Sequence, residues 1–167
     1  MTALVIAKGG LNLDEAAARP AAPPPSEREI VHVGGIQTVR AALPDGGYTL
    51  TNPRIGTVRV TAGAGHSYRW QAPSTTLAGL ADLLNDGIGF VPGVVDLTGA
   101  KGNYEIDLKV SLADAFSAAA TTPADIQDAL LKSFNRGLAP VGLQLQLRKA
   151  PVEIIVVDRV ERAPTGN

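Results

Sequence analysis

The chain has 167 residues, of which 45 % are apolar and only 4 % aromatic, and its formal net charge is −1. Such a chain is expected to fold as a single domain over residues 1–167, and because it has no cysteine it has no disulfide, thiolate nucleophile or cysteine-based zinc site. Its balanced charge argues against binding to nucleic acid, and because no apolar run reaches about 20 residues we expect no insertion into a membrane.

The chain opens on the short apolar run 3–7, which predicts a strand. This run is too short for a signal peptide and has no charged lead-in, so we expect no signal peptide; the abrupt start suggests a fragment of a longer protein. Residues 12–28 contain A-A-A-R-P-A-A-P-P-P and show no hydrophobic period. Because proline has no backbone donor, we expect a Pro/Ala-rich surface loop over 12–28.

Residues 29–72 are predicted to form β-hairpins. Short segments rich in β-formers alternate there with the turn signals Gly-Gly, Pro-Asp-Gly-Gly, Asn-Pro and Gly-Ala-Gly. The predicted strands are Glu29–Val33, Ile36–Leu43, Tyr48–Thr51, Ile55–Ala62 and His66–Gln71.

A first helix is predicted after Pro73, where residues 74–76 offer N-cap hydroxyls and Gly87 ends the pattern. Four leucines at helical spacing define its apolar face: Leu77, Leu80, Leu83 and Leu84. Residues 113–121 are expected to form a loop or a short helix.

A second helix is predicted to begin with Thr122 as its N-cap and Pro123 at its first position, and to end at Gly137 in a left-handed cap. Its expected buried stripe is Ile126, Ala129, Leu130, Ser133 and Phe134.

Strands around the second helix alternate between apolar and polar residues. The apolar positions are Tyr104, Ile106, Leu108 and Val110 in one strand, and Leu143, Leu145 and Leu147 in another. The segment Val152–Val160 is apolar on both faces and is predicted to be a central strand. We therefore expect an α+β fold: a two-layer sandwich with a mostly antiparallel or mixed sheet, two main helices on one face, extra β-hairpins, and a helix–strand–strand–helix–strand–strand core over 73–162.

Residues 94–108, V-V-D-L-T-G-A-K-G-N-Y-E-I-D-L, carry a family resemblance, together with Gly142–Leu145, Lys149–Glu153 and Asp158–Arg162. They resemble an uncharacterised family, a domain of unknown function common in soil Acidobacteria. The resemblance covers the two ends of the chain and matches the middle hairpins poorly. Leu97 stands where that family usually has lysine, and Arg159 where it usually has histidine.

The resemblance implies a parent protein that is exported, periplasmic or secreted, and is sometimes joined to an antibiotic-sensor-type membrane metallopeptidase. More distantly, the order of elements is similar to the short N-terminal domain of secretins and TonB-dependent receptors. Those domains are docking and signalling modules, so at the level of fold the resemblance implies an interaction domain.

Asp96 belongs to an Asp-Leu-Thr-Gly run that is close to two catalytic motifs without matching either. Aspartic proteases have no residue between the aspartate and the hydroxyl residue, and P-type ATPases have lysine at the second position. We expect a strand that ends in a turn, in which Asp96 accepts backbone N–H bonds and Gly99 takes a positive φ.

The candidate metal ligands are the two histidines and three acidic residues: His32, His66, Glu29, Asp96 and Asp107. If the strands that carry the histidines pair, two imidazoles and a carboxylate could hold Zn²⁺ or another divalent ion that activates water. No His-x-His or His-Glu-x-x-His motif supports this arrangement. We therefore expect two separate, packed or solvated histidines and no cofactor, with the metal site as the alternative.

The candidate binding surface is His66, Tyr68 and Trp70, which alternate onto one face of their predicted strand. Tyrosine and tryptophan are favoured at recognition surfaces, and the alternative is that they fill the core. No Gly-x-Ser-x-Gly, Ser-x-x-Lys or phosphate-loop pattern occurs.

Two functional hypotheses follow. The first is a non-catalytic binding domain that docks a protein or small-molecule ligand through a sheet edge or the aromatic face. The second is a small metal-dependent hydrolase that acts on phosphate or other activated esters. A homo-oligomer formed by strand pairing at an exposed edge is a further prediction.

Overall fold

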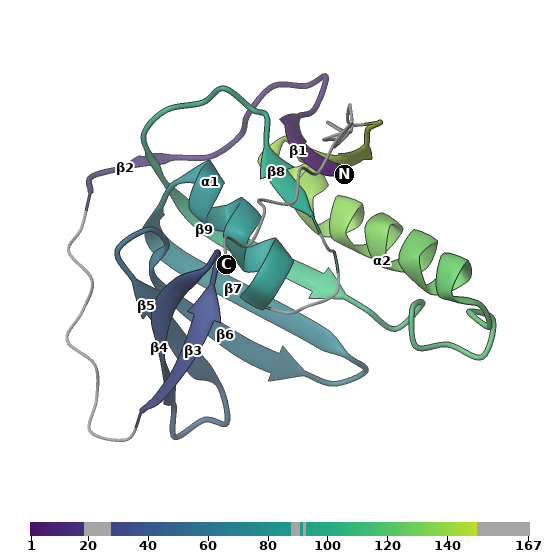
Figure 1. Ribbon diagram of the computed structural model, residues 1–167, viewed down its shortest axis with the longest axis horizontal. Helices are drawn as coiled ribbons and strands as arrows, with labels where there is room; N and C mark the ends of the chain where they lie inside the picture. The colour runs from purple at the N-terminus through teal and green to yellow at the C-terminus, as the bar shows by residue number, and fades with distance from the viewer. Residues whose placement is uncertain (19–27, 88–90, 92, 150–167) are drawn as a thin grey trace, which may run out of the picture.

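The computed structural model describes residues 1–18, 28–87, 91 and 93–149, and these residues form an α+β fold (Figure 1). The predicted strand Val152–Val160 lies outside the described residues. The strands are β1 (Thr2–Ile6), β2 (Glu15–Ala16), β3 (Glu29–Val33), β4 (Ile36–Ala42), β5 (Tyr48–Asn52), β6 (Gly56–Gly63), β7 (Ser67–Thr75), β8 (Val94–Asp96), β9 (Asn103–Ser111) and β10 (Leu143–Leu147). The α-helices are α1 (Leu77–Asp82), which continues as a π-helical turn (Leu83–Gly87), and α2 (Pro123–Leu138), which is followed by a 3₁₀ turn (Ala139–Val141).

Among the described residues the strands divide between two sheets. The large sheet has the order β2-β9-β7-β6-β5-β4-β3 and is antiparallel throughout. The small sheet has the order β10-β1-β8, in which β1 pairs antiparallel with β10 and parallel with β8. The antiparallel or mixed pairing is as predicted, but the strands flanking the second helix, β9 and β10, lie in different sheets.

The hairpins of β3 to β7 follow the sequence pattern closely. Each strand pairs with the next in the chain, and the turns fall at the predicted glycine-rich and Asn-Pro positions. One difference concerns His66, which was predicted to start the last of these strands. It lies in the preceding turn with a φ of 57°, and β7 begins at Ser67.

The loop predicted over 12–28 contains one short strand. β2 pairs with β9 through Glu15 and Tyr104, and residues 19–27 lie outside the described part of the chain. The two-residue pairing matters because β9 would otherwise present this edge to solvent in the described structure.

The large sheet has one apolar and one charged face. The inner face carries Trp70 and Leu108, which pair across β7 and β9 and are buried. The outer face carries Arg69, Asp107 and Lys109, which are exposed. This arrangement is the one that strict apolar–polar alternation in β9 predicts.

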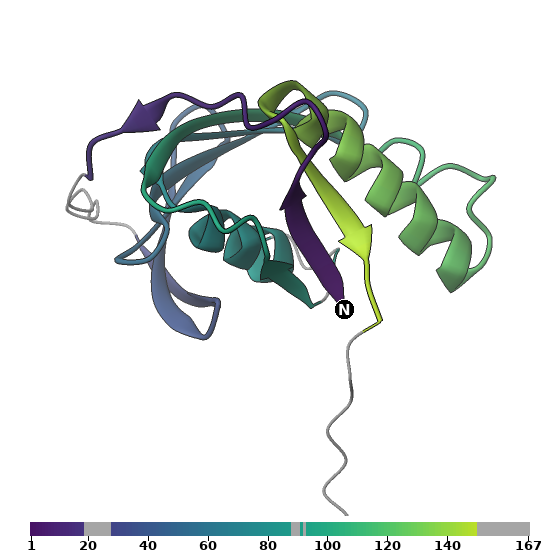
Figure 2. The ribbon, with the colours of Figure 1, turned by 90° about the horizontal axis from the view of Figure 1, so that it is seen from above.

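Helix α1 packs beneath the curved large sheet, as the view from above shows (Figure 2). Thr76 caps it: its side-chain oxygen accepts a hydrogen bond from the N–H of Gly79 at 3.0 Å. All four predicted leucines of this helix and its π-helical turn are buried. Pro73 and residues 74–75, however, belong to β7 and not to a lead-in to the helix.

Helix α2 brings Phe134 into the core, where its ring lies 6.0 Å from that of Trp70. Its N-terminus is capped as predicted, with Thr122 and Asp125 forming a reciprocal capping box. The predicted burial of Ile126 is wrong, because Ile126 is 37 % exposed and Ala129 only partly buried. The first turns of α2 extend past the sheets, and the buried stripe is Leu130, Ser133, Phe134 and Leu138 (Figure 1).

The predicted left-handed cap at Gly137 is also wrong. Gly137 lies inside α2, where an added Cβ would sit 2.7 Å from the carbonyl oxygen of Lys109, so the glycine permits close approach of helix and strand. The left-handed residue is Gly142, which has a φ of 76° and follows the 3₁₀ turn. Leu147, predicted to face inward, is 64 % exposed at the end of β10.

Candidate functional site

The two histidines lie on strands that do not pair. β3, which carries His32, and β7, which His66 precedes, are separated in the large sheet by β6, β5 and β4. With a spacing of about 4.8 Å between neighbouring strands, their axes are about 19 Å apart. The condition on which the predicted metal site depended is therefore not met.

The carboxylates of that predicted site are also engaged locally. Asp107 forms two hydrogen bonds with Arg69, at 2.8 and 2.5 Å, and Arg69 thereby holds the pKa of Asp107 below its usual range. Asp96 accepts hydrogen bonds from the N–H and hydroxyl of Thr98, and Gly99 has a φ of 68°, which confirms the predicted turn. Within the described ranges, no group of three or more His, Asp or Glu side chains is arranged to hold a metal ion.

The predicted aromatic surface is divided between core and solvent. Trp70 is 4 % exposed and belongs to the core. Tyr68 is half-buried on the same inner face, next to the core. His66 is exposed in the turn before β7, where its ring lies 4.9 Å from that of Phe116 at an interplanar angle of 37°. Of the three predicted residues, Tyr68 is the one that is placed on the inner face and partly accessible.

A row of paired side chains extends the inner face from this core to Tyr48. Tyr48 pairs with Val60, and Val60 pairs with Trp70. Val60 and Trp70 are buried, whereas Tyr48 is half-buried at the far end of the row. Tyr48 therefore marks the place where the inner face passes from core to accessible surface.

Arg40 lies beside Tyr48 on the same face. The register pairs Arg40 with Leu50 and Ala42 with Tyr48, so Arg40 and Tyr48 are diagonal neighbours on β4 and β5. The guanidinium carbon of Arg40 lies 4.4 Å from the centroid of the Tyr48 ring, within the range of a cation–π interaction. Burial raises the pKa of the Tyr48 phenol above its ordinary value, and the charge of Arg40 opposes that shift.

Glu29 completes this group from β3. It pairs with Arg40 in the sheet register, and its carboxylate accepts a hydrogen bond from Nη1 of Arg40 at 3.4 Å. This distance is long for a charge-assisted bond, which typically measures about 2.7–2.9 Å. Both side chains are exposed, so the pair is weak and open to exchange with another partner.

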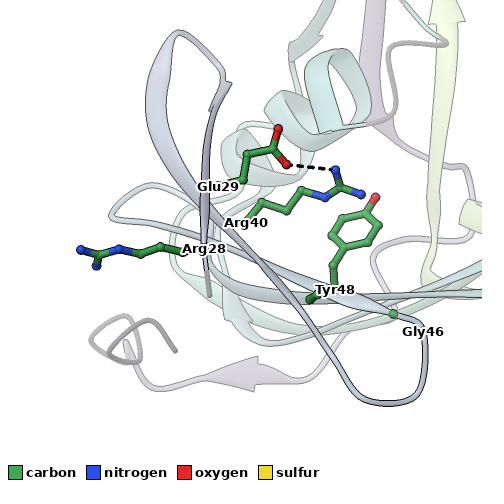
Figure 3. A pocket seen from close by; sticks show the side chains of 7 residues that line it. Arg28, Glu29, Arg40, Gly46 and Tyr48 are labelled. Carbon is green, nitrogen blue, oxygen red and sulfur yellow. Dashed lines mark hydrogen bonds and ion pairs between the residues drawn. The ribbon is translucent and has the colours of Figure 1, made fainter. Parts of the chain in front are cut away.

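These residues border a pocket of about 360 Å³, which we call the Arg40 pocket. It is lined by Arg28, Glu29, Arg40, Ala42, Gly46, Gly47 and Tyr48. Figure 3 shows Arg40 between the Glu29 carboxylate and the Tyr48 ring, while the side chain of Arg28 extends away from them. The pocket combines an aromatic ring, an apolar wall at Ala42 and a guanidinium whose other N–H groups make no hydrogen bond with the described residues. Its volume is within the range of small-molecule sites.

The sequence prediction of function missed Arg40 and Tyr48. A usable signal existed, because the strands around the turn at 43–47 place Ala42 opposite Tyr48, and Arg40 is two residues away on the same face. The glycines of that turn indicated the hairpin, and the register would have followed from it.

None of the helices in the described part of the chain is long and apolar enough to cross a membrane. Comparisons with curated proteins and with solved structures found no match. A family model matches residues 2–160, a range that includes the middle hairpins as well as the two ends. The family match is therefore wider than the resemblance in the sequence, which matched the middle hairpins poorly. The chain belongs to the family described as protein of unknown function (DUF3738).

Proposed function

We propose that this domain is a non-catalytic binding module whose contact surface is the accessible end of the inner sheet face, at the Arg40 pocket. The observation that carries the proposal is the stacked pair of Arg40 and Tyr48 beside an open pocket. Arginine and tyrosine are among the residues that dominate binding energy at recognition surfaces.

The supporting structure around this pair is rigid. Tyr48 packs against the buried part of the inner face, and the strand pairing of β3, β4 and β5 fixes the backbone of Glu29, Arg40 and Tyr48. A preformed site on paired strands loses less conformational freedom on binding than a site on a loop. Tyr68, half-buried on the same face, extends the surface toward β7.

A screen of small-molecule fragments by saturation-transfer NMR tests the proposal. Wild-type protein is compared with the double variant Tyr48→Ala/Tyr68→Ala, and Arg69→Gln serves as a control on the outer face. We expect several fragments to bind the wild type and the control and to lose their signal with the double variant. Fragments that bind all three proteins equally, or no fragment binding at all, would contradict the proposed surface.

The metal-dependent hydrolase is the alternative that the sequence suggested. It requires His32 and His66 in one site, and no observation favours it, because β3 and β7 are separated by other strands. Phosphoesterase activity that disappeared in both His32→Ala and His66→Ala would restore this alternative and overturn the binding proposal.

The docking role and the exported parent protein that the family resemblance implies are part of the same proposal. A docking role similar to that of secretin and TonB-receptor N-terminal domains agrees with a binding module, and so does a parent protein that works outside the cytoplasm. Pairing of two copies through β3, the outermost strand of the large sheet among the described residues, is a separate prediction. Sedimentation equilibrium of wild type and Ile30→Lys would detect it as a dimer lost in the variant.

A further inference from the structure

We infer that the Arg40 pocket recognises a carboxylate that is attached to a flat apolar group. The inference rests on the proposed function, and it names the chemical class of ligand that the pocket takes. Three observations carry it: the state of Arg40, the resident carboxylate of Glu29 and the wall formed by Tyr48 and Ala42.

Arg40 is positioned for bidentate recognition of a carboxylate. The cation–π contact with Tyr48 restrains the guanidinium without using its N–H groups, which lie at its edge. One edge nitrogen, Nη1, donates to Glu29 at 3.4 Å, and the other donors make no hydrogen bond to a described residue. A planar guanidinium with its orientation fixed and its fork accessible is matched to a carboxylate.

Glu29 shows that a carboxylate fits this location, and it is a weak competitor. Its contact is long, and its side chain is about two-thirds exposed, at 66 %. An incoming carboxylate that approached Arg40 at ordinary hydrogen-bond distance would displace Glu29 into solvent at little cost. Glu29 therefore competes with the ligand carboxylate for Arg40, and removal of the Glu29 charge is expected to strengthen binding.

The local charge favours a monoanion over a dianion. Arg40 and Glu29 cancel, Arg28 adds one positive charge at the rim, and Asp45 in the turn between β4 and β5 is balanced by its ion pair with Arg59 of β6. Arg28 has no ion-pair partner among the described residues, and its side chain extends away from Arg40, so it contributes a general positive charge at the rim (Figure 3). The net charge of these five groups is +1.

The wall of the pocket beside Arg40 is suited to an apolar part of the ligand. Ala42 and Tyr48 are cross-strand partners on the inner face, and both line the pocket. An aromatic ring and a methyl group thus form part of the pocket wall, against which a flat apolar group packs while its carboxylate reaches Arg40.

Benzoate and benzamide are the probes, because they share size and shape and differ in the charge of one group. Their affinities are measured by NMR titration at constant ionic strength with wild type, Arg40→Gln, Glu29→Gln and Arg69→Gln. Arg69→Gln is a matched control, because Arg69, like Arg40, is an exposed arginine paired with a carboxylate, but it lies on the outer face of the sheet.

We expect benzoate to bind the wild type about tenfold or more tightly than benzamide, because hydrogen bonds to a charged group are the stronger ones. Arg40→Gln is expected to remove this preference, and Arg69→Gln to leave it unchanged. Glu29→Gln is expected to tighten benzoate binding several-fold and to leave benzamide unaffected, an effect that damage to the fold would not produce.

Equal affinity for the two probes, or benzoate binding that is unchanged in Arg40→Gln, would overturn the inference. So would failure of benzoate to bind, and so would weaker benzoate binding in Glu29→Gln. These outcomes are distinct from failure of the proposed function, because neutral fragments that lose binding in the Tyr48→Ala/Tyr68→Ala variant would keep the surface and reject only the carboxylate.

Discussion

The guanidinium carbon of Arg40 and the centroid of the Tyr48 ring lie 4.4 Å apart, across the pairing of β4 with β5. An exposed cation–π pair of this kind contributes about 0.5–1 kcal/mol to the free energy of unfolding. This pair matters more for the position of Arg40 than for stability, because it holds the N–H groups of Arg40 at the mouth of a pocket.

Tyr48 is expected to titrate above the ordinary pKa of a tyrosine, because burial disfavours the charged phenolate. A pKa raised by folding means that the folded state holds its proton more tightly than the unfolded state. The corresponding stability is present below the unfolded pKa of about 10 and is lost as the pH rises through the folded value.

Ultraviolet absorbance titration of wild type and Tyr48→Phe checks this prediction. The variant should lack a phenol that titrates above the ordinary pKa of tyrosine, and its stability should fall less steeply above about pH 10 than that of the wild type. If the curves of wild type and variant differed only by one tyrosine of ordinary pKa, the burial of Tyr48 would be contradicted.

Asp107 is expected to contribute to unfolding at low pH. The hydrogen bonds and charge of Arg69 lower its pKa, so the folded state binds this proton more weakly than the unfolded state. The contribution is present above the unfolded pKa of about 3.9 and is lost as the pH falls through the folded value.

Urea denaturation of wild type and Asp107→Asn between about pH 2 and pH 6 measures this effect. The difference between the two proteins should shrink as the pH falls below about 4, and it should be small throughout because the pair is solvent-exposed. A difference that is independent of pH would show that the carboxylate is not the cause.

Phe134 packs α2 against the large sheet together with Leu130 and Leu138. It is fully buried, and its ring lies 6.0 Å from that of Trp70 on β7. Phe134→Ala is expected to lower the free energy of unfolding by about 3–5 kcal/mol, measured by chemical denaturation, because it removes this contact and leaves a cavity. Ile126→Ala on the exposed first turns of the same helix is the control and should change it by less than about 1 kcal/mol.

Gly142 and Gly65 are a matched pair for testing close packing. Both have a positive φ, of 76° and 67°, so both variants to alanine carry the cost of that conformation. At Gly142 the added Cβ would also collide with the backbone of Gly10, whereas at Gly65 nothing lies within 4 Å.

Gly65→Ala is therefore expected to cost about 1 kcal/mol of stability, and Gly142→Ala clearly more. Thermal unfolding monitored by circular dichroism gives the comparison. Equal melting temperatures for the two variants would mean that residues 10 and 142 are not in contact in solution.

The hairpins of β3 to β7 were predictable from sequence because their information is local. Each turn signal lies between the two strands that it joins, and a strand pairs with its neighbour in the chain. The cap at Thr122 was readable for the same reason, and Thr76 was one of three candidates for the other cap, since each cap involves residues within one turn of helix.

The remaining features depend on contacts between distant parts of the chain. Gly137 has the residue type of a helix end, but it serves the approach of α2 to Lys109, which the local pattern does not contain. The pairing of β1 with β8 and β10 joins the start of the chain to segments far along it. The Arg40 pocket falls between these cases: its strands were predicted, and its residues came together only once the register was known.

Amide chemical-shift mapping in the presence of benzoate tests the central claim most directly. Backbone ¹H–¹⁵N shifts are compared between sodium benzoate and sodium chloride at equal ionic strength, so that salt effects cancel. The account predicts dose-dependent changes concentrated at residues 28–29, 40–42 and 46–48, which line the pocket. Changes concentrated on α2 or on the small sheet, or no dose-dependent change at the pocket, would contradict it.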